Sequence, residues 1–262
     1  MERTVLVSDA GGVRTIMLNR PERKNALTPG MQEELIEALE TAGAAEACRV
    51  VVLRGAGDAF CGGLDLSVLQ GMNEKGAAEH GADAARVAKM FRTLYELGKP
   101  TVAVVQGAAI AGGTGLATIC DFTLAAPEAR FGYTEVRIGF VPGLVSAYLT
   151  MQVGDKRARE LLMSGRLFGA EEGYRLGLVT EVVAAEGLDA RAAELAESLM
   201  KNSPESLRAT KRLLAEQNRA WLDKATELAM AANAEARGTE DFREGVASFL
   251  EKRRPRWAET AR

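Results

Sequence analysis

The sequence predicts an α/β fold whose carboxyl-terminal region is entirely helical. Short apolar runs, typical of buried strands, alternate with longer segments that have the 3.6-residue periodicity of helices. Glycine-rich turns follow two of these runs, and such turns commonly join strands to helices in α/β folds. Beyond Leu188 β-branched residues become rare and only helical patterns remain.

The first elements expected are two strands and a helix. Apolar runs at Thr4–Ser8 and Val13–Leu18 flank Asp9–Gly12, a turn sequence that predicts a β-hairpin. Thr28-Pro29 then has the residue types that start helices, and the pattern predicts a helix to about Ala47.

Two apolar runs, Arg49–Arg54 and Thr101–Val105, predict the central strands. Gly55–Leu66 follows the first and Gln106–Leu116 the second, and both are rich in glycine. The helical pattern of Ala77–Leu97 lies between them. If the two strands are parallel neighbours, both turns emerge at the carboxyl edge of the sheet, where open α/β sheets place ligands.

Further short strands and helices are predicted after the second glycine-rich turn. We expect strands at Phe122–Ala125 and Val179–Val183, and helices near Val145–Val153, Asp155–Met163 and Ala170–Leu176. The helical tail is predicted as Leu188–Lys201, Pro204–Leu214, Leu222–Ala236 and Thr239–Lys252. We therefore divide the chain into an α/β core, residues 1–190, and a helical region, residues 191–262.

Composition excludes several classes of function. At 262 residues and 47% hydrophobic content the chain can bury a substantial core, and a net charge of −3 provides no overall basic field for nucleic acid. The cysteines Cys48, Cys61 and Cys120 are odd in number and lack metal-ligand spacing, which indicates reduced thiols. With no signal-peptide pattern and no membrane-length apolar run, we expect a cytoplasmic protein without membrane or metal sites.

The glycine-rich turns are candidate anion sites. A turn of this kind leaves backbone N–H groups unpaired at the positive end of a helix dipole, where a developing oxyanion can rest. The same turns also serve phosphates or simple packing, although neither matches the dinucleotide fingerprint or a nucleotide P-loop.

Several segments carry a family resemblance: Asn19–Leu27, Phe60–Leu66, Gly107–Leu116, Cys120–Phe122, Phe131–Glu135 and Asp241–Arg253. They resemble the crotonase superfamily, the enoyl-CoA hydratases and isomerases, and they occur in order along nearly the whole chain. The resemblance implies a spiral of strand-strand-helix repeats whose carboxyl-terminal helices cap the site and form a homotrimer, or a hexamer built as a dimer of trimers. It also implies an acyl-CoA thioester as substrate and no separate cofactor.

The chemistry implied is formation of a thioester enolate. By resemblance, the backbone N–H groups of Leu64 and Gly112 stabilise its negative oxygen, and Glu135 is the acid or base. The resemblance places adenosine and pantetheine contacts at Arg23, Lys24 and Ala26, and further contacts on a carboxyl-terminal helix at Phe249 and Lys252. In the glycine-rich turns it implies contacts at Gly62, Gly63, Leu64, Asp65, Leu66, Gly112, Gly113 and Gly115.

One departure from the family pattern bears on the reaction. Hydratases of this family hold a water between two glutamates; Glu135 matches the second position, and Gly115 stands at the first. One carboxylate suffices to move a proton between C2 and C4, so the sequence favours 3-enoyl to 2-enoyl isomerisation. Hydration of a 2-enoyl-CoA remains the alternative reaction, with Thr114 or Tyr133 as the second group that holds the water.

Other polar residues have alternative interpretations. Glu135 could instead be an ordinary glutamate that faces solvent and takes no part in the chemistry. Asp65 and Asp121 are more typical of carboxylates that cap backbone amides. We expect His80 to be solvated within a surface loop at Asn73–Gly81. Residues expected to form the acyl pocket wall are Leu69, Met72, Met90 and Leu116.

A different class of function is a catalytically silent acyl-CoA binder or an RNA-associated protein, since a few relatives bind RNA. The acidic balance and the lack of aromatic residues interleaved with basic ones argue against RNA.

Overall fold

A computed structural model describes residues 3–72 and 76–258. Its strands form two sheets. The larger sheet has the order β1 (Val5–Ala10), β2 (Val13–Leu18), β3 (Val50–Gly55), β5 (Thr101–Val105), β7 (Phe122–Ala125), β10 (Glu181–Val182). The smaller has the order β4 (Ala59–Cys61), β6 (Ala108–Ile110), β8 (Arg130–Gly132), β9 (Phe168–Gly169).

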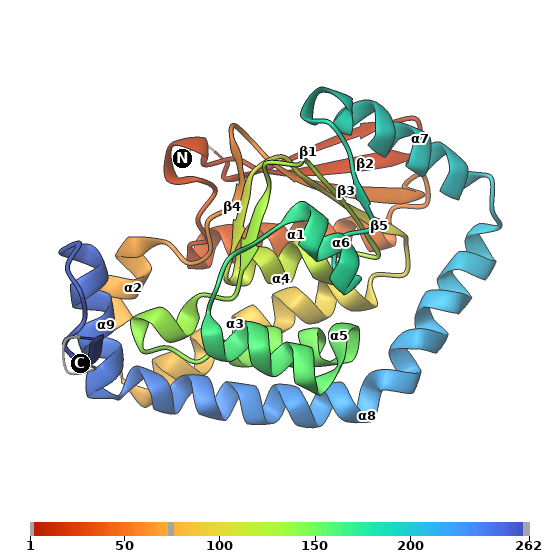
Figure 1. Cartoon of the computed structure of the whole chain (residues 1–262). Coiled ribbons are helices and arrows are strands. Elements are labelled where there is room, and N and C mark those ends of the chain that lie inside the picture. Colours follow the sequence, from red (N-terminus) through yellow and green to blue (C-terminus); the bar gives the residue numbers. More distant parts are fainter. Residues whose placement is uncertain (1–2, 73–75, 259–262) are drawn as a thin grey trace.

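The chain repeats a strand-strand-helix unit. Strands β3, β5 and β7 each run in the larger sheet, and the next strand of each pair, β4, β6 or β8, runs in the smaller one (Figure 1). Helices follow each pair: α2 (Leu66–Met72) and α3 (Ala77–Glu96), then α4 (Gly112–Ile119), then α5 (Gly143–Ser164). This is the spiral that the resemblance implied, and the α/β class with a helical carboxyl-terminal region is confirmed.

The glycine-rich turns differ from the expectation in one respect. Each central strand leads first into a three-residue strand of the second sheet, and only then into a helix. The short strands pair with each other, Ala59 opposite Ala108, so that the two turns start side by side. Three residues are too few to show a period-2 pattern, which is why the sequence did not predict them.

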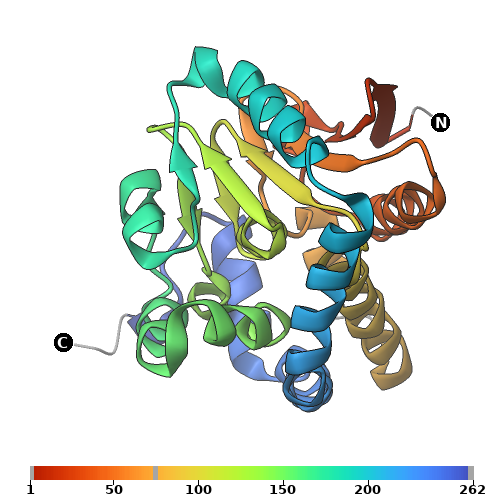
Figure 2. The ribbon, with the colours of Figure 1, turned by 90° about the vertical axis from the view of Figure 1, so that its right-hand side faces the viewer.

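The larger sheet is covered on both faces because its strands are apolar on both sides. Val50 and Val52 pack with α7 (Leu188–Met200), whereas Val51 and Leu53 belong to the core that includes α1 (Pro29–Ala44). Figure 1 and Figure 2 show α7 lying along one side of the strands. Strands β3 and β5 are parallel neighbours, so both glycine-rich turns follow the carboxyl ends of adjacent strands.

Threonine side chains cap the starts of two helices. Thr28 Oγ1 accepts a hydrogen bond from the Met31 N–H at 3.2 Å, with Pro29 as the first helical residue. In the same way Thr239 Oγ1 accepts from the Phe242 N–H at 3.1 Å at the start of α9 (Glu240–Leu250). The two helices expected before and after residue 154 are the halves of α5, which is interrupted at Gly154 (φ 74°).

The long helix α8 (Pro204–Arg237) corrects the prediction of two separate helices at Pro204–Leu214 and Leu222–Ala236. The residues between them include no glycine or proline, so nothing stops the helix, and Leu222 anchors it in the core. It passes beside α3 and α5 (Figure 1). The remaining short elements are η1 (Pro21–Arg23), η2 (Glu135–Ile138), α6 (Ala170–Leu176), η3 (Ala185–Gly187) and η4 (Arg256–Ala258).

His80 is not solvated, contrary to the expectation. It lies in the first turns of α3 and is 7% exposed, and its carbonyl oxygen accepts from Arg237 Nη1 of α8 at 2.9 Å. Packing of α8 over α3 therefore covers a segment whose own sequence is polar. Residues 73–75 of the expected loop lie outside the described residues.

The three cysteines, Cys48, Cys61 and Cys120, are buried thiols. Within residues 3–72 and 76–258, no helix combines the length and the apolar character needed to cross a membrane. The division proposed at residue 190 lies within α7 and stays a prediction.

Candidate active site

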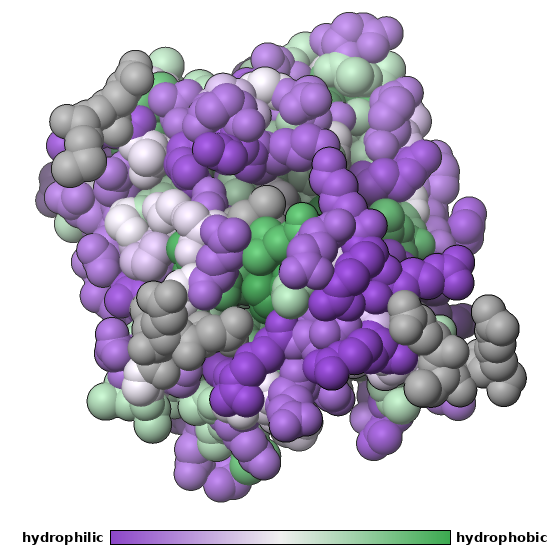
Figure 3. All heavy atoms as spheres, turned by 90° about the vertical axis from the view of Figure 1, so that its left-hand side faces the viewer, coloured by the Kyte–Doolittle hydropathy of each residue, from purple (hydrophilic) through white to green (hydrophobic). Residues whose placement is uncertain are grey.

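A cavity of about 780 Å³ opens beside the two glycine-rich turns. Its walls come from these turns, from η2 and the start of α5, and from α3, α8 and α9. Figure 3 shows the face on which α2 and α9 lie: hydrophobic atoms appear in a hollow that hydrophilic residues surround. Such a mainly apolar cavity with a polar rim suits an acyl chain attached to a charged carrier.

The first turn is held by a short parallel bridge to Leu27. The Leu27 N–H donates to the Gly63 oxygen at 2.7 Å, and the Asp65 N–H donates to the Leu27 oxygen at 3.0 Å. Gly63 has φ +91°, and a Cβ there would lie 3.0 Å from the Ile110 oxygen of the second turn. This close approach needs glycine, and it brings the two turns together beside Leu64.

The second turn presents the start of α4. The Ala111 N–H donates to the Gly132 oxygen at 2.7 Å, while Ala111 itself has an unusual φ of 53°. Gly112 then begins the helix, so its N–H has no acceptor within the helix. Among the described residues, no acceptor is bonded to the N–H of Leu64 or Gly112, and both residues line the cavity.

Glu135 begins η2 and lines the same cavity. Its Oε2 is buried and has no hydrogen-bond partner in the described chain. Burial raises the pKa of this carboxyl from 4.5 to about 7, because the charged form loses its hydration. A carboxyl group with such a pKa can both take and return a proton near neutral pH.

The position beside Gly115 is filled. A Cβ on Gly115 would lie 2.7 Å from Val145 Cγ1 and 3.1 Å from Phe91 Cζ. Val145 and Phe91 line the cavity, whereas Gly115 lies behind them. The first carbon of any side chain at this position would therefore meet two apolar side chains.

The side chains considered for holding a water are already engaged. Thr114 Oγ1 donates to the Ala109 oxygen at 2.6 Å and accepts from the Gly132 N–H at 3.0 Å. The Tyr133 hydroxyl pairs with Thr118 Oγ1 at 3.3 Å, and Tyr133 is 1% exposed. Both residues act in packing the second turn.

Asp65 and Asp121 hold the backbone, as their alternative interpretation predicted. Asp65 accepts from the Ser67 N–H at 2.9 Å and pairs with Arg20 at 2.8 Å, at one side of the cavity. Asp121 accepts from the Thr101 N–H at 2.8 Å, outside the cavity lining.

Most of the residues expected to contact substrate line the cavity: Arg23, Lys24, Ala26, Gly62, Leu64, Asp65, Gly112 and Phe249. Gly63 and Gly113 instead allow close backbone packing, because a Cβ on Gly113 would lie 2.2 Å from the Cys61 oxygen. Leu66 is the first residue of α2. Lys252 is exposed, with φ 52°, and the cavity wall there includes Arg253 instead.

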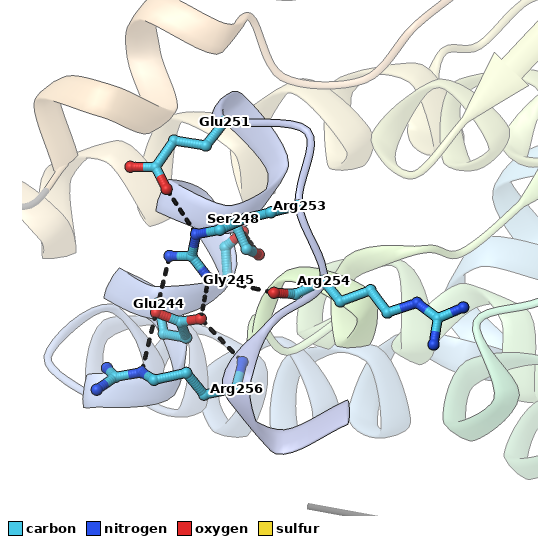
Figure 4. A network of polar contacts seen from close by, with 7 residues as sticks. All are labelled: Glu244, Gly245, Ser248, Glu251, Arg253, Arg254 and Arg256. Atoms are coloured by element: carbon cyan, nitrogen blue, oxygen red, sulfur yellow. Dashed lines mark hydrogen bonds and ion pairs between the residues drawn. The ribbon is translucent and has the colours of Figure 1, made fainter. Parts of the chain in front are cut away.

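A network of charges fixes the chain after α9 at the cavity mouth (Figure 4). Glu244, 7% exposed, accepts from Arg253 Nη1 at 2.5 Å and from the Arg256 N–H at 2.9 Å. These hydrogen bonds lower the pKa of Glu244 to about 2. Arg253 also pairs with Glu251 at 2.5 Å, so its guanidinium is held by two carboxylates.

Comparison with known proteins decides the family. The model of the enoyl-CoA hydratase/isomerase family matches residues 8–260. The chain belongs to this family. A Thermus thermophilus protein provisionally named enoyl-CoA hydratase is 45% identical over 249 residues, covering 95% of this chain and 98% of that protein. The crotonyl-CoA hydratase of Syntrophomonas wolfei is 32% identical, with 91% and 92% covered.

Solved structures agree with this assignment to the enoyl-CoA hydratase/isomerase family. An enoyl-CoA hydratase from Mycobacterium avium has a TM-score of 0.85 and 31% identity, covering 98% of this chain and all of that one. An enoyl-CoA hydratase from Bacillus halodurans, at 22% identity, shows the same fold with a TM-score of 0.88, covering 94% of this chain and 100% of that one. The crotonase superfamily assignment made from the motifs is confirmed.

In this family member, sequence patterns missed part of the site. Gln32 of α1 and Arg237 of α8 line the cavity although they are 2% and 3% exposed. Each is one polar residue in an amphipathic helix, a pattern that does not distinguish a buried side chain from a solvated one. Of the expected wall residues Leu69 and Met90 line the cavity, whereas Met72 and Leu116 pack elsewhere in the core.

Proposed function

We propose that this enzyme moves the double bond of an enoyl-CoA thioester from the 3-position to the 2-position, with Glu135 carrying the proton. The observation that supports it most is the filling of the space beside Gly115 by Val145 and Phe91. Glu135 has a carboxyl oxygen without a hydrogen-bond partner in the described chain, whereas Asp65, which also lines the cavity, pairs with Arg20. Proton transfer within the substrate by one carboxyl group is simpler than addition of water.

The mechanism begins with the thioester carbonyl between the N–H groups of Leu64 and Gly112. Glu135 removes a proton from C2, and the electron pair delocalises over the dienolate to the carbonyl oxygen. The two N–H groups stabilise that oxyanion, and losing one such donor typically costs about 3–4 kcal/mol of barrier. The acid form of Glu135 then returns the proton at C4, which leaves the double bond between C2 and C3.

Arg23 and Lys24, exposed on the rim of the cavity, are proposed to bind the phosphates of coenzyme A. Phe249, 54% exposed on α9, is proposed to pack against the carrier. The thioester carries its own activating group, so the reaction needs no additional cofactor.

Hydration of a 2-enoyl-CoA is the second candidate, because several relatives are named as hydratases. Such a reaction needs a second polar group to hold the water. The engagement of Thr114 and Tyr133 within the protein argues against either in that role.

Incubation with 3-hexenoyl-CoA and, separately, 2-hexenoyl-CoA distinguishes these functions. We expect 2-hexenoyl-CoA from the first substrate, and its loss in Glu135→Gln. Prompt formation of 3-hydroxyhexanoyl-CoA from the second would establish the hydratase instead. If neither thioester is converted but both bind, the chain is a non-catalytic acyl-CoA binder; binding of labelled RNA would support the remaining alternative.

We also propose assembly as a homotrimer or as a dimer of trimers. Three large apolar side chains of α8, seven residues apart, are about half exposed: Leu214, Trp221 and Leu228. Seven residues are nearly two helical turns, so the three share one stripe, which a second copy of the chain can cover.

A further inference from the structure

We propose that the acyl pocket has a carboxylate subsite at Arg237, and that the preferred substrates are acyl-CoA thioesters whose acyl chain ends in a carboxylate. The inference rests on the proposed function, because it takes the cavity as the acyl-CoA site. The proposed subsite binds the end of the acyl chain that lies away from the thioester.

Arg237 is a buried cation with unused hydrogen-bonding capacity. It is the last residue of α8, it is 3% exposed, and it lines the cavity. Within the described chain its Nη1 donates to the His80 oxygen at 2.9 Å, and its Nε has no acceptor. A guanidinium has five N–H donors, and the contacts of the described chain leave part of this capacity unused beside the cavity.

Burial makes the charge of Arg237 costly, and the ring of Phe140 and the charge of Asp83 offset part of that cost. Its guanidinium carbon lies 5.6 Å from the ring centre of Phe140, a residue of the cavity wall that also packs against Phe242. Burial lowers the pKa of Arg237, and the charge of Asp83 opposes this effect. Asp83 itself is held by Arg86 at 2.9 Å. Buried charges are normally paired, and a ligand carboxylate in the cavity would complete the pairing.

Arg237 and Glu135 line the same cavity, and Phe140 connects the segments that carry them. The Phe140 N–H donates to the Glu135 oxygen at 3.0 Å, so the ring on which Arg237 stacks is fixed to the segment that carries Glu135. Asn233, one turn before Arg237, donates to the Val141 oxygen at 3.1 Å and holds α8 against the same segment. A chain bound with its C2 near Glu135 can therefore extend toward Arg237 along a wall of Phe140 and Val141.

A purely structural role is the competing explanation. Arg237 lies at the carboxyl end of α8, where a cation complements the helix dipole, and it ties this end to α3 through His80. That role does not require the side chain to face the cavity or to leave Nε unpaired. It predicts no preference between acyl chains.

Equilibrium binding of saturated thioesters tests the subsite independently of catalysis. Titration calorimetry would compare glutaryl-CoA with pentanoyl-CoA, adipyl-CoA with hexanoyl-CoA, and suberyl-CoA with octanoyl-CoA. For at least one chain length we expect the carboxylate-ended thioester to bind about tenfold to hundredfold more tightly, as for a charge-assisted hydrogen bond in a buried site. Equal or tighter binding of the methyl-ended thioester at every length overturns the proposal.

Variants assign the preference to Arg237. Arg237→Met should remove the preference, and Arg237→Lys should keep part of it because the cation remains. Arg212→Met, on the exposed side of the same helix, is the matched control and should keep the whole preference. A folded Arg237→Met protein that retains the preference overturns the assignment. If that variant does not fold, the wild-type comparison still decides, and conversion of 3-hexenoyl-CoA separately tests the proposed function.

Discussion

Glu135 differs from an ordinary surface glutamate by the burial of its carboxyl oxygen Oε2. Because the raised pKa of about 7 comes from lost hydration, the base form accumulates only as the pH rises through 7. We expect kcat/KM for 3-hexenoyl-CoA to fall below pH 7 and to reach a plateau above it. Glu135→Gln should lose about 10²- to 10⁴-fold in kcat/KM at the plateau. A midpoint near pH 4.5 would contradict the desolvated site.

Gly115 is a packing position rather than an empty one. Gly115→Ala places a methyl group 2.7 Å from Val145, and we expect overpacking to cost about 1–3 kcal/mol in the free energy of unfolding, measured in urea. Gly81→Ala is the matched control, because nothing lies within 4 Å of its added Cβ in the exposed face of α3. That control should be neutral or stabilise by up to about 1 kcal/mol. Equal stability changes in both variants would show that the pocket can accommodate a side chain here.

Lys211, near the start of helix α8, connects this helix to the larger sheet through Asp121. Lys211 Nζ lies 2.6 Å from Asp121 Oδ2, which also accepts from the Thr101 N–H at 2.8 Å and from Thr101 Oγ1 at 2.9 Å. Asp121→Ala should therefore cost about 1–3 kcal/mol in unfolding free energy, since it leaves the buried Thr101 N–H without this acceptor. The activity of the folded variant should be unchanged.

The same connection can be divided into its parts by a double-mutant cycle. Lys211→Met should cost less than Asp121→Ala, and the coupling between the two should be about 1 kcal/mol or below because the pair is partly exposed. Reduced turnover in folded Asp121→Ala would instead give this carboxylate a part in the chemistry.

The elements also show where sequence patterns succeed and fail. Caps such as Thr28 and Thr239 are local interactions between residues three apart, and they were readable from the sequence. The burial of His80 was not, because it depends on α8, which packs from a distant part of the chain. The continuity of α8 was missed although residues 215–221 include neither glycine nor proline.

The complete molecule is expected to be an assembly. Trp221→Glu places a charge in the middle of the stripe Leu214, Trp221 and Leu228 on α8. We expect light scattering after gel filtration to show a trimer or hexamer for the wild type and smaller species for this variant. Arg212→Glu, outside the stripe, is the control. A monomeric wild type would remove the proposed interface.

The sequence by itself determined the family, the α/β class, the two glycine-rich turns and the position of Glu135, because motifs and periodicity are properties of neighbouring residues. Only the tertiary structure decided that Val145 and Phe91 fill the space beside Gly115, and that Arg237 of α8 lines the cavity. The physical reason is that burial depends on contacts between residues far apart in the sequence. Val145 and Arg237 are 30 and 122 positions from Gly115 along the chain. The pattern of one helix does not show which other elements pack against it.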